Sequence, residues 1–476
     1  MSFRIAVIGG GIAGLAASHR LLELGAARGI PLDLTLLEAG PRLGGTIATE
    51  RAGDPGRACV IEAGPDALLA AKPWGLDLCG RLGLSGRLIG TQPASRRTFV
   101  AHRGRLHPLP EGFALLAPSR FAPVLRSRLF TWRGKTRMAM DLVLPRRRGE
   151  ADESLGHFVT RRFGREVLER VAQPMVAGIY TADPETLSLA ATMPRFLELE
   201  RRYGSVIRGL RRTRGRSKAR EAGGFRGSLF VAPAGGMGEL VSALAAHLAG
   251  ATVRLGMRVR SIEPEQGGSR YRLAMDDGSL LHAEAVIVAT EAHRAARLLD
   301  RLDPALASML GAVPYASSAA VTLAYRRDQV AHPLDGSGFV VPAAEGRPLI
   351  ACTFSSVKFA GRAPEGAVLL RAFFGGALRP GVLKEEDSEL AGLAQRELAS
   401  LLGIRGVPQL VRVHRHPLAM PQYLVGHLDR VAAIEAQASR HTGLALAGGA
   451  YRGVGIPDCI RSGEQAAECI LSALTR

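Results

Sequence analysis

The chain has 476 residues, 47% of them hydrophobic, which is enough for two or three domains around a large buried core. Lys and Arg total 62 against 43 Asp and Glu, and the formal charge of +19 favours an anionic partner such as nucleic acid, lipid headgroups or a substrate that carries carboxylates. The five cysteines are widely spaced and include no C-x-x-C pair, so neither a disulfide framework nor a zinc site is indicated, and no bound metal is expected.

The first predicted element is a short strand, Arg4 to Ile8, close to the start of the chain. It is not preceded by the charged and then apolar layout of a signal peptide. No stretch of about 18 uninterrupted apolar residues follows it. We therefore expect a cytoplasmic protein without a membrane-spanning helix.

A glycine turn follows this strand and leads into an amphipathic helix. Its G-x-G-x-x-G spacing places Gly9 in the tight turn, Gly11 where a pyrophosphate approaches the backbone, and Gly14 where helix and strand pack closely. The N-terminus of the helix then offers free N–H groups to a phosphate. A turn that serves packing alone is the alternative interpretation.

The second predicted strand, Asp33 to Leu37, ends at Glu38, where a carboxylate can accept hydrogen bonds from ribose hydroxyls and favours NAD or FAD over NADP. The stretch E-A-G-P-R-L-G-G-T resembles the Glu plus Arg-x-Gly-Gly element of the amine oxidase, phytoene desaturase and protoporphyrinogen oxidase group of flavoenzymes. A surface turn is the alternative for the glycine doublet. The resemblance implies FAD contacts at Gly9, Gly10, Gly11, Ile12, Ala13, Gly14, Glu38, Ala39, Arg42, Gly44, Gly45 and Thr46.

Three further segments resemble places where that group of enzymes contacts FAD. G-P-D-A is similar to the stretch beside the isoalloxazine ring, and one valine matches the position whose backbone meets adenine. The turn near the C-terminus, G-G-A-Y-R-G-V-G-I-P, is similar to the one at the ribityl chain and the pyrimidine end of the flavin, although relatives often have Asn where Gly449 stands. The matching residues are Gly64, Pro65, Asp66, Ala67, Val259, Gly449, Val454, Gly455 and Ile456. Because a cofactor binds beyond the carboxyl ends of strands in an open α/β sheet, we expect both ends of the chain to meet on one FAD.

The resemblance implies an α/β fold with three domains: an FAD-binding Rossmann-like domain of the amine-oxidase type, an α/β substrate domain and a helical membrane-associated domain. The FAD-binding domain is predicted to be discontinuous, over residues 1–88, 231–295 and 438–476. The substrate domain is predicted over 89–99, 211–230 and 296–437, and the basic helical domain over 100–210. A capped helix is expected to begin near Asp152 to Glu153.

Three stretches narrow the resemblance to the haem-pathway porphyrinogen oxidases. They are P-M-V-A-G-I-Y-T-A-D-P-E-T-L-S from Pro174, P-Q-Y-L-V-G-H from Pro421 and A-Y-R-G-V-G-I-P-D-C-I from Ala450. The implied activity is the oxidation of protoporphyrinogen IX to protoporphyrin IX, a loss of six electrons and six protons in three hydride transfers to flavin, with O₂ as the acceptor. Coproporphyrinogen III as substrate, another FAD amine oxidase or desaturase, and a flavin-carrying scaffold without turnover remain alternatives.

Such a reaction requires an apolar slot beside the flavin and a cationic anchor for propionates. Arg97 matches the position where relatives have a carboxylate-binding arginine, and a guanidinium suits a propionate. A solvated arginine is the alternative. The predicted slot walls, with core packing as their alternative, are Gly178, Phe339, Val340, Thr353 and Phe374. No general acid or base is predicted, since hydride chemistry belongs to the cofactor, and four histidines are interpreted as structural rather than proton carriers: His157, His414, His416 and His427.

The excess of basic residues predicts a surface partner. Apolar residues mixed with arginine in Phe113 to Met140 fit peripheral attachment to anionic lipid at the inner face of the cell membrane, where each basic residue contributes about 1 kcal/mol. The basic run Arg195 to Arg220 could attract nucleic acid, but no nucleic-acid-binding fold accompanies it, so no such partner is expected. The resemblance also implies a homodimer.

Overall fold

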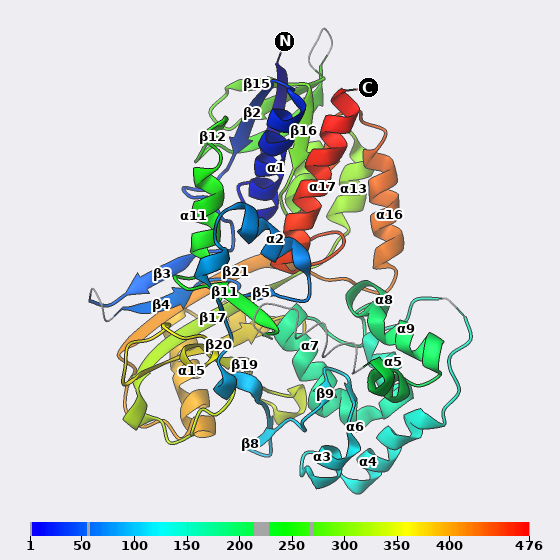
Figure 1. Cartoon of the computed structure of the whole chain (residues 1–476), viewed down its shortest axis with the longest axis vertical. Helices are drawn as coiled ribbons and strands as arrows, with labels where there is room; N and C mark the ends of the chain where they lie inside the picture. The colour runs from blue at the N-terminus through cyan, green and yellow to red at the C-terminus, as the bar shows by residue number, and fades with distance from the viewer. Residues whose placement is uncertain (1, 55–57, 150, 214–227, 266–269, 476) are drawn as a thin grey trace.

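The computed structural model describes residues 2–54, 58–149, 151–213, 228–265 and 270–475. These residues form three regions (Figure 1): a parallel sheet with helices that contains both ends of the chain, a mixed seven-stranded sheet, and a group of helices beside that sheet. The part of the predicted basic run from residue 214 onwards lies outside the described residues.

A five-stranded sheet holds the first and last strands of the chain. Its order is β12-β2-β1-β16-β22, and all neighbouring strands are parallel. The central strands are apolar runs that are buried on both faces, as expected where helices cover a parallel sheet. Their bounds are β1 Phe3–Ile8, β2 Leu32–Leu37, β12 Ala251–Arg254, β16 Ala285–Val288 and β22 Leu444–Leu446.

Helices pack on both faces of this sheet. On one face, α1, α11 and α17 share a core with the strands, and on the other a second core contains α12, α13, α16 and the small sheet β13-β14-β15. α1 and α17 lie side by side (Figure 1), so close that a Cβ at Gly463 would stand 2.1 Å from the Ala13 carbonyl oxygen. The bounds are α1 Ile12–Arg28, α11 Gly238–Ala246, α12 Ala292–Leu299, α13 Pro304–Gly311, α16 His427–Ala438, α17 Ile456–Leu474, β13 Val259–Pro264, β14 Tyr271–Met275 and β15 Leu280–Ala283.

The seven-stranded sheet has the order β21-β17-β20-β19-β18-β7-β8, with one parallel pair, β18 and β7. One face packs against α15 (Asp387–Leu402) in an apolar core, and residues of the other face join the core of the helical region. The strand bounds are β7 Thr98–His102, β8 Arg105–Pro108, β17 Tyr315–Arg326, β18 Gly338–Val340, β19 Leu349–Phe354, β20 Ala367–Gly375 and β21 Leu410–Pro421.

The helical region packs around a third apolar core. Its α5 begins after Ser154, whose side chain accepts a hydrogen bond from the His157 N–H, so the predicted capped helix is present within two residues of its expected start. The bounds are α3 Phe121–Arg126, α4 Trp132–Ala139, α5 Leu155–Phe163, α6 Arg165–Val167, α7 Gln173–Tyr180, α8 Leu189–Thr192 and α9 Pro194–Tyr203. No helix in the described part of the chain has the length and the apolar composition needed to cross a bilayer.

Short elements connect the three regions. They include the two-stranded pair β3-β4 and the three-stranded sheet β5-β11-β6, and α2 follows β5 in the chain (Figure 1). The bounds are α2 Pro73–Arg81, β3 Thr49–Ala52, β4 Cys59–Glu62, β5 Leu68–Leu69, β6 Leu88–Gly90, β9 Phe113–Ala114, β10 Ala117–Pro118, β11 Phe230–Pro233 and α14 Ser355–Lys358.

Two predicted domain boundaries differ from the structure. The boundary between 99 and 100 falls inside β7, because β7 and β8 complete the seven-stranded sheet before the helical region begins. The boundary between 295 and 296 falls inside α12, which packs with α13 under the parallel sheet, and the seven-stranded sheet resumes only at β17. An apolar helix face or strand can pack in either region, so composition alone does not indicate whether β7, β8 and α12 belong to the parallel sheet, the seven-stranded sheet or the helical region.

Candidate active site

The first glycine turn joins β1 to α1 at the carboxyl edge of the parallel sheet. Gly9 has a φ of 106°, and a Cβ at Gly14 would stand only 1.9 Å from the Gly9 carbonyl oxygen. At Gly11, the residue before α1, a Cβ would meet nothing within 4 Å. Ile12 and Ala13 open the helix, whose first turn carries no acidic side chain. The turn is therefore closed by two glycines and leaves open space before a helix N-terminus, where an anion is favoured.

Glu38 ends β2 beside this turn. Its Oε2 accepts a hydrogen bond from the Gly10 N–H and its Oε1 one from the Gly40 N–H, both at 2.7 Å. Its carbonyl accepts from the N–H of Met257, two residues before Val259, at 2.9 Å. The carboxylate is thus held between the first turn and the loop that contains Ala39, which is where a ribose lies in folds of this kind.

Arg42 folds the glycine doublet against the first turn. Its guanidinium donates to the carbonyl oxygens of Gly45 at 2.7 Å and Ile47 at 3.0 Å, and the Gly44 N–H donates to the Gly10 carbonyl at 2.8 Å. Both glycines have positive φ angles, 101° and 57°. Arg42 therefore binds the backbone carbonyls around the doublet and holds this loop in place.

The segment Gly64–Ala67 packs against the same doublet. A Cβ at Gly64 would stand 1.9 Å from the carbonyl oxygen of Thr46, so only glycine fits there. The preceding carbonyl, that of Ala63, accepts hydrogen bonds from Arg371 Nη2 at 2.9 Å and from His416 Nε2 at 2.8 Å, which reach it from the seven-stranded sheet. Pro65 and Asp66 follow, and the Asp66 carboxylate accepts from Lys358 Nζ at 2.8 Å.

The final turn, from Gly448 to Gly455, is held by the P-Q-Y-L-V-G-H segment. Tyr423 Oη donates to the Gly449 carbonyl at 2.6 Å and accepts from the Gly453 N–H at 2.8 Å. His427 stacks on the Tyr423 ring, with centroids 3.8 Å apart, and its Nε2 donates to the Tyr451 carbonyl at 2.8 Å. The sequence identified this segment only as a family signature. Its contacts explain what its tyrosine and histidine do.

The start of α17 completes this edge of the sheet. Gly455 is the N-cap, Ile456 is the first helical residue, and Val454 packs against the core of the helical region. Lys72 Nζ, from the segment after Gly64–Ala67, pairs with Asp458 in the first turn of α17 at 2.6 Å. The C-terminal turn therefore lies next to the segment that follows Gly64–Ala67, and α17 packs against α1, so the two ends of the chain lie together.

These residues fit FAD. The open space at Gly11 and the acid-free N-terminus of α1 suit a diphosphate, and Glu38 suits a ribose. A second helix start, that of α17, stands near the segment that follows Gly64–Ala67, and an extended dinucleotide needs a second set of contacts beyond its diphosphate. A mononucleotide would use only the first of these two places.

The seven-stranded sheet presents one face to this edge. Strand register places Val340 opposite Ala351, Ala351 opposite Phe373, and Thr353 opposite Arg371, so these side chains share a face. Gly178 on α7 is exposed beside it, where a Cβ would stand 3.8 Å from Val340 Cγ1. The structure thus brings together three of the five predicted slot walls: Gly178, Val340 and Thr353.

Phe339 and Phe374 lie on the other face of the sheet. They are 1% and 0% exposed and belong to the core that packs against α15. Successive side chains of a strand point to opposite faces, so a shift of one residue exchanges slot and core. Phe339 and Phe374 therefore belong to the core, which was the alternative to their role as slot walls. Phe373 is half-buried, packs against the helical region and places an aromatic side chain on the slot face.

Arg97 precedes β7 and is largely solvated. Its side chain is 67% exposed, and Nη1 pairs with Asp335 Oδ2 at 2.6 Å. The carbonyl of Arg97 accepts from the Ser337 N–H at 2.7 Å, which ties it to the segment before β18. An incoming carboxylate would therefore compete with Asp335 for this guanidinium.

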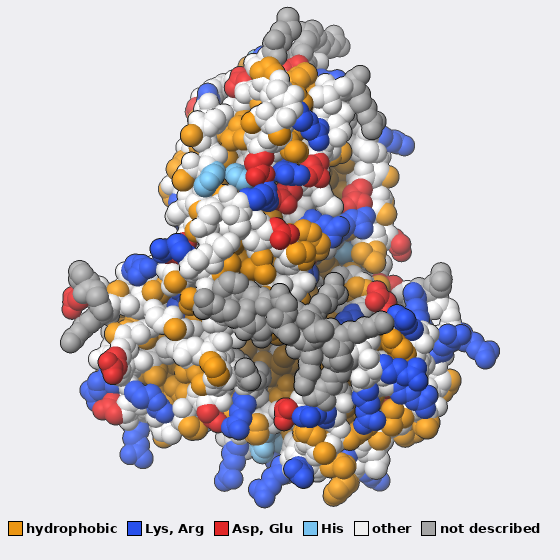
Figure 2. All heavy atoms as spheres, viewed as in Figure 1, with side chains coloured by type: hydrophobic (Ala, Val, Ile, Leu, Met, Phe, Trp, Pro, Cys, Tyr) orange, Lys and Arg blue, Asp and Glu red, His pale blue; other side chains and the backbone are white. Residues whose placement is uncertain are grey.

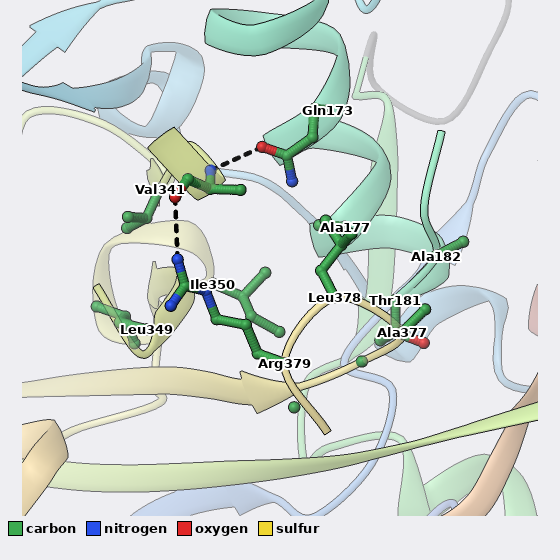
Figure 3. Close-up of a pocket in the computed structure, with 13 residues that line it drawn as sticks. Gln173, Ala177, Thr181, Ala182, Val341, Leu349, Ile350, Ala377, Leu378 and Arg379 are labelled. Atoms are coloured by element: carbon green, nitrogen blue, oxygen red, sulfur yellow. Dashed lines mark hydrogen bonds between the residues drawn. The ribbon is translucent and has the colours of Figure 1, made fainter. Parts of the chain in front are cut away.

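A small pocket opens on the adjoining flank of α7 (Figure 3). Its walls are mostly small and apolar, and Arg379 reaches across it to donate to the Ala343 carbonyl at 2.9 Å. Gln173 Oε1 accepts from the Ala343 N–H at 2.8 Å. The lining residues are Gln173, Ala177, Thr181, Ala182, Val341, Ala343, Leu349, Ile350, Gly375, Gly376, Ala377, Leu378 and Arg379.

The four histidines have structural surroundings. Burial lowers the pKa of His414, of His416 and of His427, which favours the neutral ring in each. His416 and His427 donate to backbone carbonyls. His157 is 59% exposed and pairs with Glu153 at 2.8 Å on the helical region.

Comparison with known proteins also indicates a flavoenzyme. A model of the flavin containing amine oxidoreductase family matches residues 12–471. The chain is 35% identical over 471 residues to a coproporphyrinogen III oxidase of Bacillus subtilis, covering 99% of this chain and 98% of that protein. It is 32% identical over 496 residues to a protoporphyrinogen oxidase of Bos taurus, covering 99% of both. The crystal structure of a candidate protoporphyrinogen oxidase from Exiguobacterium sp. 255-15 has a TM-score of 0.86, with 30% identity and full coverage of both chains.

Proposed function

The chain belongs to the flavin containing amine oxidoreductase family, and we propose that it uses FAD to oxidise a porphyrinogen to its aromatic porphyrin in haem biosynthesis. Protoporphyrinogen IX, giving protoporphyrin IX, is the first candidate substrate. The observation that carries this proposal is the convergence of the first turn, the Gly64–Ala67 segment and the final turn on one edge that faces Val340, Ala351 and Phe373. A flat apolar macrocycle requires such a face beside the cofactor.

The reaction removes six electrons and six protons in three equal steps. Three methylene bridges of the macrocycle each lose a hydride. Of the three protons released to water, two come from pyrrole nitrogens and one comes from the fourth methylene bridge as the double bonds of the ring rearrange. FAD, when bound, supplies the two-electron acceptor, and O₂ is the proposed final oxidant, which is reduced to H₂O₂. The chain contributes binding and orientation: Gly64–Ala67 fixes one side of the ring site, and the apolar sheet face excludes water from the other.

Arg97 is the proposed anchor for a propionate. Arg97 directly precedes β7 and has an exposed guanidinium. The first residue of β7, Thr98, pairs with Gly338, which lies on the same face of β18 as Val340. The existing pair with Asp335 is exposed and therefore weak, so a substrate carboxylate can replace it at small cost. A bidentate contact would then set the orientation of the macrocycle.

Coproporphyrinogen III, giving coproporphyrin III, is the second candidate substrate. The Bacillus subtilis relative with that activity in its name is 35% identical, against 32% for the Bos taurus protoporphyrinogen oxidase. The net charge of +19 also suits a substrate with four carboxylates. Both substrates would use the same face and the same chemistry.

Steady-state assays with the two porphyrinogens, each followed by porphyrin absorbance and O₂ consumption, decide between them. The proposal predicts about three O₂ consumed per porphyrin formed, because each O₂ takes two of the six electrons. Turnover of coproporphyrinogen III alone would make the second candidate the function. If protein that contains FAD turns over neither porphyrinogen, the remaining candidate functions are an amine oxidase, a desaturase and a flavin-carrying scaffold.

We further propose that the protein attaches to an anionic membrane surface on its cytoplasmic side. Trp132, Met140 and Val143 are 69%, 44% and 77% exposed and recur at the spacing of one helix face along α4 and the turn after it. Figure 2 shows basic side chains spread over the lower half of the molecule, where these elements lie. A basic surface with apolar side chains suits peripheral binding. A homodimer is also proposed, and sedimentation equilibrium would test it.

A further inference from the structure

A web of five buried or half-buried charges lies behind the Gly64–Ala67 segment, between the parallel and seven-stranded sheets. Arg362 and Arg371 are 2% and 5% exposed, and Glu62 is 7% exposed. We call this group the Arg371 web; its members are Glu62, Asp66, Lys358, Arg362 and Arg371.

The web has more cations than anions. Lys358 Nζ pairs with both Asp66 carboxylate oxygens at 2.8 Å, and Arg362 Nη2 stands 3.9 Å from Glu62 Oε1. Arg371 acts on both carboxylates electrostatically, but its one hydrogen bond among the described residues is to the Ala63 carbonyl. Three positive groups against two negative ones leave one positive charge in a region that water does not screen.

The other titratable groups around the web do not cancel this charge. Burial lowers the pKa of both His414 and His416, which stand on β21 beside the strand of Thr322, and this favours the neutral form of each ring. From the solvent side, Glu239 and Arg51 act on Arg362 with opposite signs. The excess positive charge is therefore a property of the buried side of the segment.

Arg371 and Thr322 also carry polar atoms that no described group satisfies. Arg371 Nε and Thr322 Oγ1 are buried without a hydrogen-bond partner, and the two residues sit opposite each other on β20 and β17. Both line a small cavity together with Glu62, Asp66 and Arg362. Such a cavity holds about one water molecule, which could bridge these donors to the carboxylates.

We propose that Arg371 is a positioning residue for the Gly64–Ala67 segment, and that the net charge of the Arg371 web makes a flavin bound against that segment easier to reduce. The inference rests on the proposed function, which places the flavin ring beside Gly64–Ala67. Arg371 holds the carbonyl before Gly64 from a strand of the other sheet, and a positive charge nearby stabilises the negative charge that reduction brings to the ring.

The test compares the reduction potential of bound FAD in purified variants, measured by equilibration with a redox dye. Arg371→Gln and Lys358→Gln each remove a positive charge and are expected to make the potential more negative. A change of about tenfold in the reduction equilibrium is the expected size for a buried unit charge, which is about 30 mV for a two-electron couple. Asp66→Asn removes a negative charge and is expected to shift the potential the opposite way.

Two further variants separate charge from packing. Arg371→Lys keeps the charge and is expected to restore most of the potential. Arg412→Gln is the matched control, because Arg412 stands on the next strand opposite Thr322 but is 43% exposed and pairs with Glu50, so water screens its charge. Its potential is expected to remain that of the unchanged protein.

The directions in which the reduction potentials shift decide whether the inference holds. Equal potentials in all variants, or a shift of Asp66→Asn in the same direction as Lys358→Gln, would overturn the inference. If Arg371→Gln fails to fold, the opposite signs of the Lys358 and Asp66 variants still give the answer. The dye assay needs no porphyrinogen, so a wrong substrate assignment and a wrong assignment of the Arg371 web give different results.

Discussion

Tyr423 shows how one side chain can fix a cofactor-binding turn that is distant in sequence. Its hydroxyl bridges the carbonyl of Gly449 and the N–H of Gly453, and the stacked ring of His427 keeps it in place. Burial raises the pKa of Tyr423, so the hydroxyl keeps its proton and donates at every physiological pH. The backbone of the final turn is therefore held by a residue outside the turn.

Replacing Tyr423 with Phe is expected to weaken FAD binding by about tenfold, because two hydrogen bonds to the turn are worth roughly 1 to 2 kcal/mol. The measurement is the FAD dissociation constant from fluorescence of the released flavin. Tyr451→Phe is the matched control within the same turn, because the buried Tyr451 hydroxyl has no partner among the described residues. Equal losses in both variants would contradict the role given to Tyr423.

Some site residues could be predicted from the sequence and others could not. The glycines of the first turn could be predicted because each has a steric task that spacing alone reveals, as the 1.9 Å approach at Gly14 confirms. Phe374 was predicted from the sequence as a slot wall, but its neighbour Phe373 is the residue on the slot face. A strand that is buried on both faces shows no alternation of polar and apolar residues, so its sequence does not indicate which residues point to which face. Arg371 was missed because its partner, the Ala63 carbonyl, lies 308 residues away in the chain.

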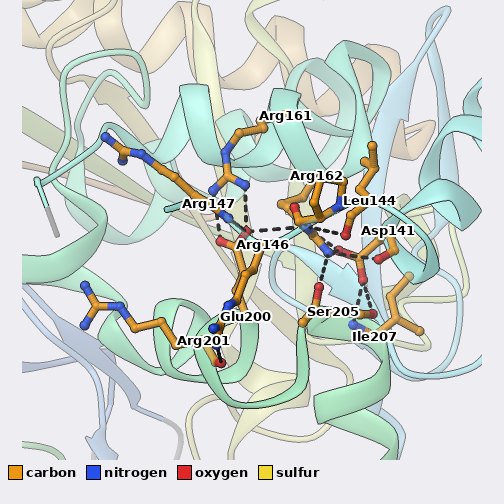
Figure 4. Close-up of polar contacts among 12 residues, drawn as sticks. Asp141, Leu144, Arg146, Arg147, Arg161, Arg162, Glu200, Arg201, Ser205 and Ile207 are labelled. Atoms are coloured by element: carbon orange, nitrogen blue, oxygen red, sulfur yellow. Dashed lines mark hydrogen bonds and ion pairs between the residues drawn. The ribbon is translucent and has the colours of Figure 1, made fainter. Parts of the chain in front are cut away.

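At the scale of elements, the helical region is organised around buried charges as well as apolar side chains. Arg162 on α5 and Asp141 are both 0% exposed, and Arg162 Nε donates to Asp141 Oδ1 at 2.6 Å (Figure 4). The second Asp141 oxygen accepts from Ser205 Oγ at 2.6 Å and from the Ile207 N–H at 2.9 Å. This one carboxylate thus joins the segment after α4 to α5 and to the segment after α9.

Asp141→Asn is expected to destabilise the protein by about 3 kcal/mol, because it removes the charged partner at 2.6 Å from the buried Arg162 and leaves, among the described residues, only Glu200, whose Oε1 stands 3.4 Å from Arg162 Nη1. Chemical denaturation monitored by far-UV circular dichroism measures the change. Glu169→Gln is the control, since its pair with Arg165 on α6 is solvent-exposed and is expected to leave the midpoint unchanged. A stable Asp141→Asn protein would show that the pair is dispensable.

Asp303 couples two helices in a pH-dependent way. It caps α13 by accepting from the Leu306 N–H at 2.9 Å, and it also accepts from Gln437 and His441, beyond α13 in the chain, at 2.8 Å each. Burial alone would raise its pKa, but these hydrogen bonds outweigh burial and lower the pKa to about 2. A carboxyl with a depressed pKa stabilises the fold above its ordinary pKa of about 4 and ceases to do so as the pH falls through 2.

The destabilisation caused by Asp303→Asn is therefore expected to be complete at pH 6 and to shrink between about pH 4 and pH 2. Urea midpoints of the variant and the unchanged protein, taken across this range, give the difference. A difference that stays constant down to pH 2 would mean that the Asp303 pKa is not depressed.

At the scale of the whole molecule, both ends of the chain meet in the parallel sheet, and the middle of the chain builds the seven-stranded sheet and the helical region. The general plan could be predicted because strand, turn and helix signals at each end are local in sequence. The boundaries at 99 and 295 were misplaced, since β7, β8 and α12 are assigned to a sheet only by tertiary packing. The Phe113 to Met140 stretch contains the strands β9 and β10 and the helices α3 and α4, and its membrane role stays a prediction.

Membrane attachment can be tested by replacing two valines that have similar exposure. Val143 is 77% exposed beside the Trp132 face, and Val407 is 75% exposed in the loop between α15 and β21. Val143→Ser is expected to reduce binding to vesicles that contain anionic lipid, whereas Val407→Ser is expected to have no effect. Binding is also expected to fall as salt is raised. Equal effects of the two substitutions in a vesicle sedimentation assay would exclude this face.

The central claim is that one FAD, held by both ends of the chain, receives electrons from a porphyrinogen on the face that carries Val340 and Phe373. Anaerobic mixing of the FAD-loaded protein with protoporphyrinogen IX, and separately with coproporphyrinogen III, tests it most directly. The account predicts that at least one of them bleaches the visible absorption of the flavin within a turnover, and that admitting O₂ restores it. A flavin that stays oxidised with both substrates, or a protein that takes up no FAD, would contradict the account.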